Sequence, residues 1–451
     1  MFKRILIANR GEIALRIVRA CKELGVESVV VYSEADRYTL PVLMADDSIC
    51  IGPAPSAQSY LLPDRIIGAA KVKGAEAVHP GYGFLAESAD FARMCADNDL
   101  VFIGPSPEAI SMMGDKSRAR ETMMAGNVPV VPGSDGVVLS AEDAREIADR
   151  IGYPVLIKAK AGGGGKGMRV CESPDDIEKL YQQARTEAAA SFESDEVYIE
   201  KYLARSRHVE IQVLADAHGN AVSLCERDCS VQRRHQKLIE EAPSPALTPE
   251  LREAMSDAAL RAVRAVGYQN AGTIEFLLDE DRNFYFMEMN TRVQVEHPVS
   301  EQVTGVDIIK EQLRIASGEP MACASRAPFE PRCHAIEFRI NAEDPSIGFR
   351  PCPGVIKRFD LPGGCGVRVD THIRAGAMIP PTYDSLIAKL IVWGDTRDEA
   401  LRVAERALEE FNIEGIATTI PFHLAAIRNE VFRSGDFYTD FVETEMNGVE
   451  L

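Results

Sequence analysis

A run of glycines between lysines is the first feature of the sequence that could do chemistry. Residues 162–167 read Gly-Gly-Gly-Gly-Lys-Gly, and Lys158 stands shortly before them. Consecutive glycines cannot fill a core, and ordering them costs backbone entropy. Their N–H groups can approach phosphate oxygens closely, as in an anion-binding nest. The pattern favours a phosphate-binding loop, and the alternative is a flexible hairpin tip.

Acidic residues on two successive predicted strands form a second pattern. Glu288 and Asn290 are two positions apart, so both point to one face of a strand. Glu275 lies on the preceding strand, and the short link 279–283 permits an antiparallel hairpin. Facing carboxylates repel unless a cation separates them. Oxygen ligands without sulfur or imidazole suit Mg²⁺ on ATP phosphates; the alternative is an exposed strand with ordinary surface acids.

Arg292, Gln294 and Glu296 alternate directly after these acids. If the segment is extended, the three side chains share one side. A guanidinium, an amide and a carboxylate beside a metal–phosphate site can bind a small planar acid and supply a base. The basic cluster over 227–237 is either a further anion site or a solvated patch. These patterns predict an ATP- and Mg²⁺-dependent ligase that activates a small acid for a nitrogen acceptor.

The composition argues against nucleic acid and membranes as main partners. The 451 residues include 69 acidic and 50 basic side chains, a net charge of −19, which disfavours binding to polyanions. No apolar run approaches the roughly 20 residues that cross a bilayer. The ten cysteines are scattered without a C-x-x-C pair, which disfavours structural zinc and fits a reduced, cytoplasmic compartment.

Hydrophobic periodicity predicts the elements that position these residues. Apolar residues at helical spacing indicate a helix over 12–24, and β-branched runs indicate strands over 4–8 and 28–32. The alternation continues with helices over 64–73 and 88–98 and strands over 75–79 and 101–103. The first ~110 residues therefore predict an open, mostly parallel α/β sheet.

Two further regions follow in the sequence. Prolines and a glycine within 105–114 precede a predicted α+β region. Its expected elements are a helix over 249–266 and strands over 155–159, 168–171, 198–202, 209–215, 273–278 and 284–289. The proline-rich stretch 327–331 opens a third region, with strands over 334–340, 367–370 and 387–393 and an amphipathic helix over 397–411.

Together the motifs closely resemble the biotin carboxylase family of the ATP-grasp superfamily. The resemblance covers essentially the whole chain and rests on the glycine run and on residues 3–14, 79–85, 113–116, 207–212, 232–237 and 288–298. It implies three domains: a Rossmann-like domain with an open parallel sheet over 1–113, an α+β ATP-grasp domain over 114–330 with a mobile lid near 131–203, and an α+β C-terminal domain over 331–446.

The resemblance also implies a binding set for ATP and its metal. The nucleotide is expected on Lys116, Lys158, Gly164, Gly165, Glu200, Lys201, Tyr202, Leu203, His208, Gln232 and His235, besides Glu275 and Glu288. Two Mg²⁺ or Mn²⁺ ions are expected on Glu275, Glu288 and Asn290. The residue Lys160 departs from the family, which usually has a small hydroxyl residue there, and this extra cation at the loop entrance either contacts phosphate or points to solvent.

The implied reaction phosphorylates bicarbonate with ATP to carboxyphosphate, which delivers CO₂ to biotin. The resemblance places bicarbonate on Lys237, Arg292, Gln294 and the backbone of Val295. It makes Glu296 the base that deprotonates bicarbonate. It assigns Arg339 to the biotin enolate and Tyr82 to the neighbourhood of the biotin.

Partners follow from the same resemblance. The sequence contains no Met-Lys-Met biotinylation tripeptide, so biotin is expected on a separate carboxyl carrier protein, with carboxyltransferase subunits as further partners. The family's separate-subunit form usually serves acetyl-CoA carboxylase in fatty acid biosynthesis and is typically a homodimer. Arg19 and Glu23 resemble dimer-contact positions, and the alternative is a surface pair one helical turn apart.

Two other functions compete with this interpretation. A carboxylate–amine ligase of the same superfamily would share the acidic strands and glycine loop but lack the 292–296 and Arg339 segments. A regulatory nucleotide-binding module would have lost Glu296, Arg292 or the metal ligands, and all of these are present. The final acceptor of the carboxyl group is not predicted by the sequence.

Overall fold

The computed structural model describes residues 1–159, 168–192 and 195–449. They form two compact units. The main unit comprises Met1–Val128, Arg207–Phe276 and Glu288–Leu451, and the small unit comprises Pro129–Ser206 and Leu277–Met287. Among the described helices, none combines the length and hydropathy that a membrane span requires.

The main unit begins with a parallel five-stranded sheet in the order β3-β2-β1-β4-β5. Its strands are β1 (Arg4–Ile7), β2 (Glu27–Ser33), β3 (Asp47–Gly52), β4 (Ala77–His79) and β5 (Val101–Phe102). Its helices include α1 (Gly11–Leu24), α2 (Leu40–Met44), α3 (Pro63–Lys73) and α4 (Ala89–Asp97). The predicted open parallel α/β sheet is confirmed, whereas β3 was not predicted.

Helix α1 illustrates why these elements form. Its apolar residues Ile13, Ile17 and Cys21, which recur at helical spacing, are buried against the sheet. Gly25 ends the helix with a left-handed φ of 69°, and its N–H bonds to carbonyls of the last turn. A residue with a Cβ is strained in that conformation, so glycine at this position fixes where α1 stops.

A sheet with the strand order β13-β12-β9-β10-β11-β14-β21-β19 continues the main unit. Its members are β9 (Ser206–Ala215), β10 (Ala221–Arg233), β11 (Gln236–Ala242), β12 (Asn270–Asp279), β13 (Phe284–Asn290), β14 (His334–Asn341), β19 (Val367–Thr371) and β21 (Leu386–Gly394). Strands β11 and β14 pair antiparallel. The sheet therefore runs without interruption past the predicted domain boundary at residue 331.

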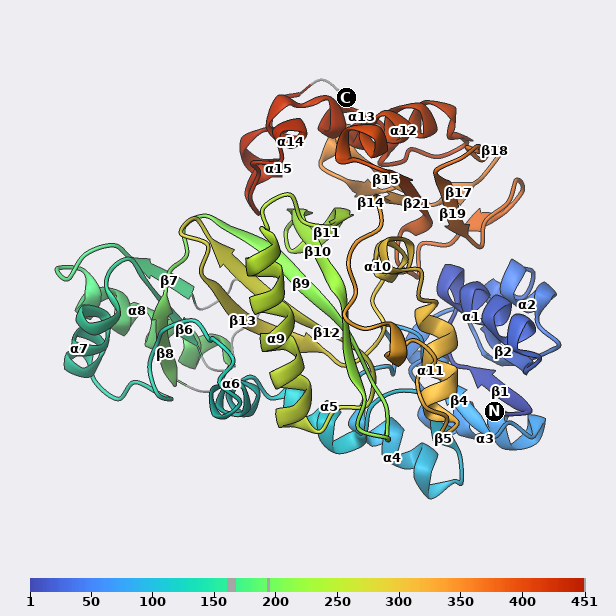
Figure 1. Ribbon diagram of the computed structural model, residues 1–451, viewed down its shortest axis with the longest axis horizontal. Coiled ribbons are helices and arrows are strands. Elements are labelled where there is room, and N and C mark those ends of the chain that lie inside the picture. The colour runs from blue at the N-terminus through green and yellow to red at the C-terminus, as the bar shows by residue number, and fades with distance from the viewer. Residues whose placement is uncertain (160–167, 193–194, 450–451) are drawn as a thin grey trace. The chain divides into compact units, whose positions relative to one another are not determined.

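Two helices pack on opposite faces of this sheet, α9 (Pro249–Val266) and α10 (His297–Thr304) (Figure 1). Successive strand residues point to opposite faces. On β10, Glu226 accepts hydrogen bonds from Arg252 of α9, and the next residue, Arg227, donates to Ser300 of α10. The α10 face carries the polar cluster described below.

The remaining elements of the main unit surround these two sheets. Helix α12 (Arg397–Glu410) starts at Thr396, whose side chain accepts from the N–H of Glu399, and it packs on β21. Further helices are α5 (Pro107–Gly114), α6 (Lys116–Ala125), α11 (Ile308–Ala316), α13 (Ile420–Arg428), α14 (Glu430–Ser434) and α15 (Phe441–Thr444). Short strands are β15 (Glu343–Asp344), β16 (Arg350–Pro351), β17 (Gly354–Val355), β18 (Arg358–Asp360), β20 (Met378–Ile379) and β22 (Asn412–Glu414).

The small unit contains an antiparallel sheet in the order β7-β6-β8. It is built from β6 (Val155–Ala159), β7 (Met168–Cys171) and β8 (Val197–Lys201), with α7 (Ala141–Ile151) and α8 (Ile177–Phe192). Alternate residues of the strands, among them Val155, Ile157 and Ile199, form its core with Tyr181 of α8. The unit thus has a hydrophobic core of its own.

Candidate active site

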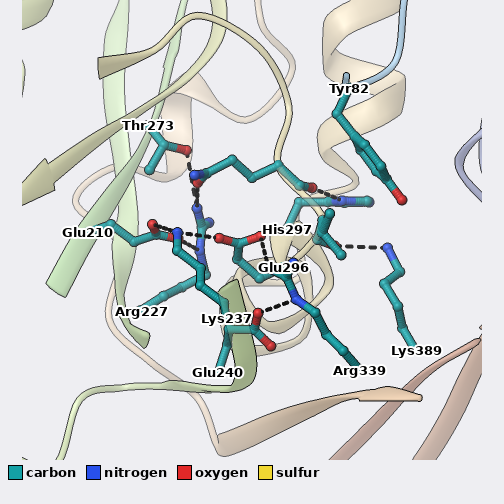
Figure 2. A network of polar contacts seen from close by, with 12 residues as sticks. Tyr82, Glu210, Arg227, Lys237, Glu240, Thr273, Glu296, His297, Arg339 and Lys389 are labelled. Atoms are coloured by element: carbon teal, nitrogen blue, oxygen red, sulfur yellow. Dashed lines mark hydrogen bonds and ion pairs between the residues drawn. The ribbon is translucent and has the colours of Figure 1, made fainter. Parts of the chain in front are cut away.

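Lys237 is the centre of a buried polar cluster on the α10 face of the main sheet (Figure 2). Its Nζ donates to Glu210 Oε2 at 2.6 Å, to Glu275 Oε1 at 3.0 Å and to Glu296 Oε1 at 2.6 Å. The three carboxylates come from β9, β12 and the start of α10. One ammonium group therefore links three elements that are distant in sequence.

Arg339 on β14 binds the other side of the Glu296 carboxylate. Its Nη2 donates to Glu296 Oε2 at 3.0 Å, and its Nε donates to Glu240 Oε1 at 2.5 Å (Figure 2). Glu296 thus lies between two cations, each bonded to a different carboxylate oxygen. The predicted base and the arginine predicted for the biotin enolate are in direct contact.

The protonation states follow from this arrangement. Burial alone would raise the pKa of Glu296, but Lys237 and Arg339 outweigh it and hold that pKa below its ordinary value. Burial alone would lower the pKa of Lys237, whereas Cys229 and the carboxylates of Glu210, Glu275 and Glu296 raise it well above its usual range. Glu296 is therefore anionic, which is the form that a general base requires.

Arg227 stabilises the cluster through its hydrogen bonds, although the sequence motifs assigned it no role. It is fully buried, and its Nε donates to Glu210 Oε1 at 2.5 Å. Its four other N–H groups bond at 2.7–3.1 Å to Gln212, Ser300, Thr273 and Gln294. The sequence signal was its place in the 227–237 cluster. The alternative interpretation of residues 227–237 as a solvated basic patch is therefore wrong for Arg227. Arg234 and His235, at the β10–β11 turn, are exposed.

The predicted metal ligands lie at the edge of this cluster. Glu275 accepts from the side-chain amides of Asn290 and Gln294, each at 2.8 Å. Burial, and then the Glu275 carboxylate, raise the pKa of Glu288. These two acids on neighbouring strands repel each other, and a cation between them would relieve that repulsion. The set of oxygen donors, two carboxylates and the Asn290 amide, fits Mg²⁺ or Mn²⁺.

Segment 291–296 is not a continuous strand. It turns into α10, for which Glu296 is the N-terminal flanking residue. Arg292 donates to Glu87 Oε2 at 3.0 Å and to Asn290 Oδ1 at 2.9 Å. The structure therefore brings Gln294 and Glu296 to the Lys237 cluster, while Asn290 links Arg292 to it.

A second buried lysine reaches the same segment from β21. Lys389 Nζ donates to the carbonyl of Val295 at 2.8 Å and forms an ion pair with Glu12 Oε1 at 3.0 Å. The Glu12 carboxylate also accepts from the Tyr82 hydroxyl. Tyr82 is thereby connected, through Glu12 and Lys389, to the backbone beside Glu296, and Figure 2 shows Tyr82 and Lys389 on the same side of the cluster. His297 bonds through Nδ1 to the carbonyl of Gln294 at 2.8 Å and so supports the segment that leads into α10.

Comparison with known protein families accounts for nearly the whole chain. Residues 1–110 match "Biotin carboxylase, N-terminal domain", residues 115–324 match "Carbamoyl-phosphate synthase L chain, ATP binding domain", and residues 337–444 match "Biotin carboxylase C-terminal domain". The chain belongs to the biotin carboxylase family. The resemblance inferred from the motifs is confirmed, as is the three-part architecture expected from it.

A bacterial relative in this family matches over its full length. The chain is 57% identical over 445 residues to "Biotin carboxylase 1" of Bacillus subtilis, covering 98% of this chain and 99% of that protein. The match therefore extends through all three regions of the chain.

Solved structures of the family are equally similar. The biotin carboxylase domain dimer of Hydrogenobacter thermophilus 2-oxoglutarate carboxylase, in complex with MgADP, ADP and bicarbonate, has a TM-score of 0.88 and 48% identity, covering 98% of this chain and 97% of that chain. A biotin carboxylase subunit of pyruvate carboxylase has a TM-score of 0.89 and 49% identity, covering 98% of this chain and 98% of that chain. Family membership thus rests on both sequence and fold.

The nucleotide residues expected from the family are distributed over both units. In the main unit, Lys116 opens α6 after the capping residue Asp115, and Gln232 is buried on β10. His208 forms an ion pair with Glu275 at 3.0 Å. Burial lowers the pKa of His208, but the Glu275 carboxylate outweighs burial and raises that pKa to about 9. His208 is therefore a cation near neutral pH.

In the small unit, Lys158 contacts the Glu200 carboxylate, and Lys201 donates through Nζ to the carbonyls of Gly152 and Tyr153 at 3.0 and 2.9 Å. The backbone N–H groups of Lys201 and Tyr202 bond to Pro132 and Pro154 at 2.8 and 3.0 Å. These two donors hold the 200–203 segment in place. Its predicted adenine contact, which includes Leu203, stays a prediction, and Gly164, Gly165 and Lys160 lie outside the described residues.

The residues that resemble dimer contacts lie on α1. Glu23 forms an ion pair with Lys310 of α11 at 2.5 Å, so its partner in this structure is not the Arg19 expected from a simple helical pair. Arg19 is exposed.

Proposed function

We propose that this member of the biotin carboxylase family is an ATP-dependent ligase that carboxylates biotin with bicarbonate. The observation that carries the proposal is the Glu296 carboxylate, bonded on one oxygen to Lys237 and on the other to Arg339. The residue proposed as the base for bicarbonate is thus in contact with the cation proposed for the biotin oxygen.

The first step concerns bicarbonate. Lys237, Arg292, Gln294 and the N–H of Val295 are proposed to hold it, and Glu296 takes the proton of its hydroxyl. The oxygen freed of that proton attacks the γ-phosphorus of ATP, the bond to ADP breaks, and carboxyphosphate forms. Because Lys237 already touches Glu296 at 2.6 Å, the cation that orients the substrate also keeps the base ionised.

The second step concerns biotin. Carboxyphosphate breaks into CO₂ and phosphate, and the phosphate takes the proton of the ureido nitrogen, which then attacks CO₂. Arg339 donates to the ureido oxygen, where negative charge develops. Tyr82, fixed by Glu12, is proposed to border the biotin ring.

ATP and its metal complete the site. Lys116, His208, Gln232 and His235 of the main unit, and Lys158, Glu200–Leu203 and the glycine loop with Gly164 and Gly165, are proposed to bind the nucleotide. Glu275, Glu288 and Asn290 would hold two Mg²⁺ or Mn²⁺ ions, which neutralise phosphate oxygens. We further propose the domain boundaries 1–113, 114–330 and 331–446, with a lid near 131–203 that excludes water from the labile intermediate.

Partners are proposed by analogy with the relatives. Biotin arrives on a separate carboxyl carrier protein, carboxyltransferase subunits take the carboxyl group onward, and two copies of the chain pair, as in the 2-oxoglutarate carboxylase domain dimer. Acetyl-CoA is the proposed final acceptor, in fatty acid biosynthesis. Relatives named for pyruvate and 2-oxoglutarate make these the alternative acceptors.

The test is ATP hydrolysis by the purified chain with and without bicarbonate and free biotin. We expect turnover to require bicarbonate and to rise with biotin. Glu296→Gln should bind ATP but lose on the order of 10²–10⁴-fold in turnover. The control variant Glu253→Gln, at an exposed residue of α9, should keep the wild-type turnover. Hydrolysis that ignores bicarbonate and biotin would instead favour a carboxylate–amine ligase, and ATP binding without turnover would favour a regulatory module.

A further inference from the structure

Glu337 is a buried acid beside this site that the reaction above does not use. It lies on β14, two residues before Arg339, and its side chain is fully buried. Neither of its carboxyl oxygens has a hydrogen-bond partner among the residues that the structure describes. A charged carboxylate without a partner is too costly to bury, so an acid in this position is kept in its neutral form.

The strand register places a second acid directly opposite. In the antiparallel pairing of β11 and β14, Glu240 is the partner of Glu337, and opposed side chains point to the same face. Oxygen Oε1 of Glu240 accepts from Arg339 Nε at 2.5 Å, while its Oε2 has no partner in the described part of the chain. Two opposed carboxyls in a buried sheet cannot both ionise cheaply, and the one bonded to Arg339 carries the charge.

The cations near Glu337 are already neutralised. Lys389, on the neighbouring strand β21, is paired with Glu12 at 3.0 Å. Arg339 is paired with Glu240 at 2.5 Å and with Glu296 at 3.0 Å. Two further titratable groups act on Glu337, the Tyr82 hydroxyl and the Glu296 carboxylate. Neither of them offers a positive charge to an ionised Glu337.

The order in which the two acids ionise agrees with this geometry. Burial, with the nearby Glu296 carboxylate adding to it, raises the pKa of Glu240 to about 7 against the opposing effect of Arg339. Burial and then the Glu240 carboxylate raise the pKa of Glu337 well above its ordinary value despite Lys389. Glu240 therefore loses its proton first, and Glu337 keeps one when Glu240 is charged.

We propose that Glu337 is a positioning residue of the biotin subsite that acts as an uncharged acid and leaves the positive charge of Arg339 available to the ureido oxygen. The proposal rests on the function proposed above, because it assumes that Arg339 faces biotin. An ionised Glu337 would be a third carboxylate around one guanidinium, and the field of Arg339 at the ureido oxygen would be weakened.

The first experiment measures whether Glu337 is neutral. Replacing an ionised glutamate by glutamine removes one negative charge, whereas replacing a protonated one changes no charge. Native capillary electrophoresis of the intact protein at neutral pH compares Glu337→Gln with the exposed Glu253→Gln as the matched control. We expect the wild-type mobility for Glu337→Gln and a shift of one charge for Glu253→Gln. A one-charge shift for both variants overturns the proposal.

The second experiment measures what the neutral state does. The KM for free biotin is followed from about pH 7 to about pH 10, and the KM for bicarbonate is followed in parallel. Ionisation of Glu337 in the wild type should raise the biotin KM on the order of tenfold, and Glu337→Gln should lose most of that rise. If Glu337→Gln does not fold, Glu337→Met, which is also uncharged, replaces it.

A wild-type biotin KM that stays constant over this range, or a rise that persists in the variant, overturns the positioning role. A bicarbonate KM that changes as much as the biotin KM would also overturn the positioning role. Failure of the proposed function is a separate result: a wild-type protein without bicarbonate-dependent, biotin-stimulated ATP hydrolysis refutes that function, while the electrophoretic comparison still decides the charge of Glu337.

Discussion

Arg227→Met is the substitution that most directly tests the buried cluster. Arg227 makes five side-chain hydrogen bonds from a position with 0% exposure. Methionine keeps the approximate length of the side chain but removes its charge and all five donors. Glu210 then retains Lys237, at 2.6 Å, as its nearest cation.

The size of the effect follows from the burial. Removing one partner of a buried ion pair costs about 3–5 kcal/mol, because the remaining charge loses its compensation. The amide and hydroxyl acceptors around Arg227 add to this cost only where they find no new donor. We therefore expect Arg227→Met to lower the free energy of unfolding by about 3–5 kcal/mol. Arg227→Lys keeps the charge but has fewer donors, so its free energy of unfolding should lie between those of Arg227→Met and the wild type.

Urea unfolding followed by circular dichroism measures this loss, and bicarbonate KM reports whether Gln294 and Glu210 keep their places. The matched control is Arg93→Met, since Arg93 pairs with Asp90 on the surface of α4 and such pairs contribute at most about 1 kcal/mol. If Arg227→Met proves no more destabilising than Arg93→Met, the cluster does not depend on Arg227 and the reasoning fails.

Three further predictions concern other parts of the site. Lys389→Met should raise the KM for bicarbonate about tenfold or more in steady-state kinetics, because the Val295 carbonyl loses a charged donor; an unchanged KM would contradict this. Glu288→Gln should raise the Mg²⁺ concentration for half-maximal ATP turnover, and a chelator should abolish turnover with little change in circular dichroism. Burial lowers the pKa of four histidines to about 3 or 4, namely His79, His297, His372 and His423. Because the unfolded chain binds protons at these residues from about pH 6.5 downward and the folded protein does not, stability should fall as pH decreases from there, by about 1.4 kcal/mol per pH unit for each histidine. The urea concentration at the midpoint of unfolding, measured between about pH 7 and pH 5, checks this. The variant His372→Asn should show a smaller loss of stability per pH unit.

Local patterns predicted part of the secondary structure, whereas strands β10 and β11 and helices α7, α8 and α10 were not predicted. Helix α9 has the predicted bounds, and α12 ends one residue before the predicted end. Strands β6 and β7 also have their predicted bounds. Such segments combine clear periodicity with capping residues, so neighbours in sequence determine them. Strand β3 was missed, and its mixed burial pattern explains the weak signal, because no single face of it is continuously apolar.

Contacts between distant segments were harder to predict. The 292–296 pattern suggested one shared side of an extended chain, yet the segment turns into α10 and divides its side chains between Glu87 and the Lys237 cluster. The sequence patterns assigned no role to Glu240 or Glu337. Only the pairing of β11 with β14 places them opposite each other in a buried layer.

The sequence by itself determined the family, the residue types that the chemistry requires, and some of the elements that carry them, because motifs and periodicity are local properties. The tertiary structure decided which charges meet: that Lys237 binds three carboxylates, that Arg227 bonds to one of these carboxylates, and that Glu337 has no hydrogen-bond partner among the residues that the structure describes. The reason is that Coulomb energies and desolvation depend on separation in space and on the exclusion of water. Both are fixed only when strands far apart in the chain pair in one sheet.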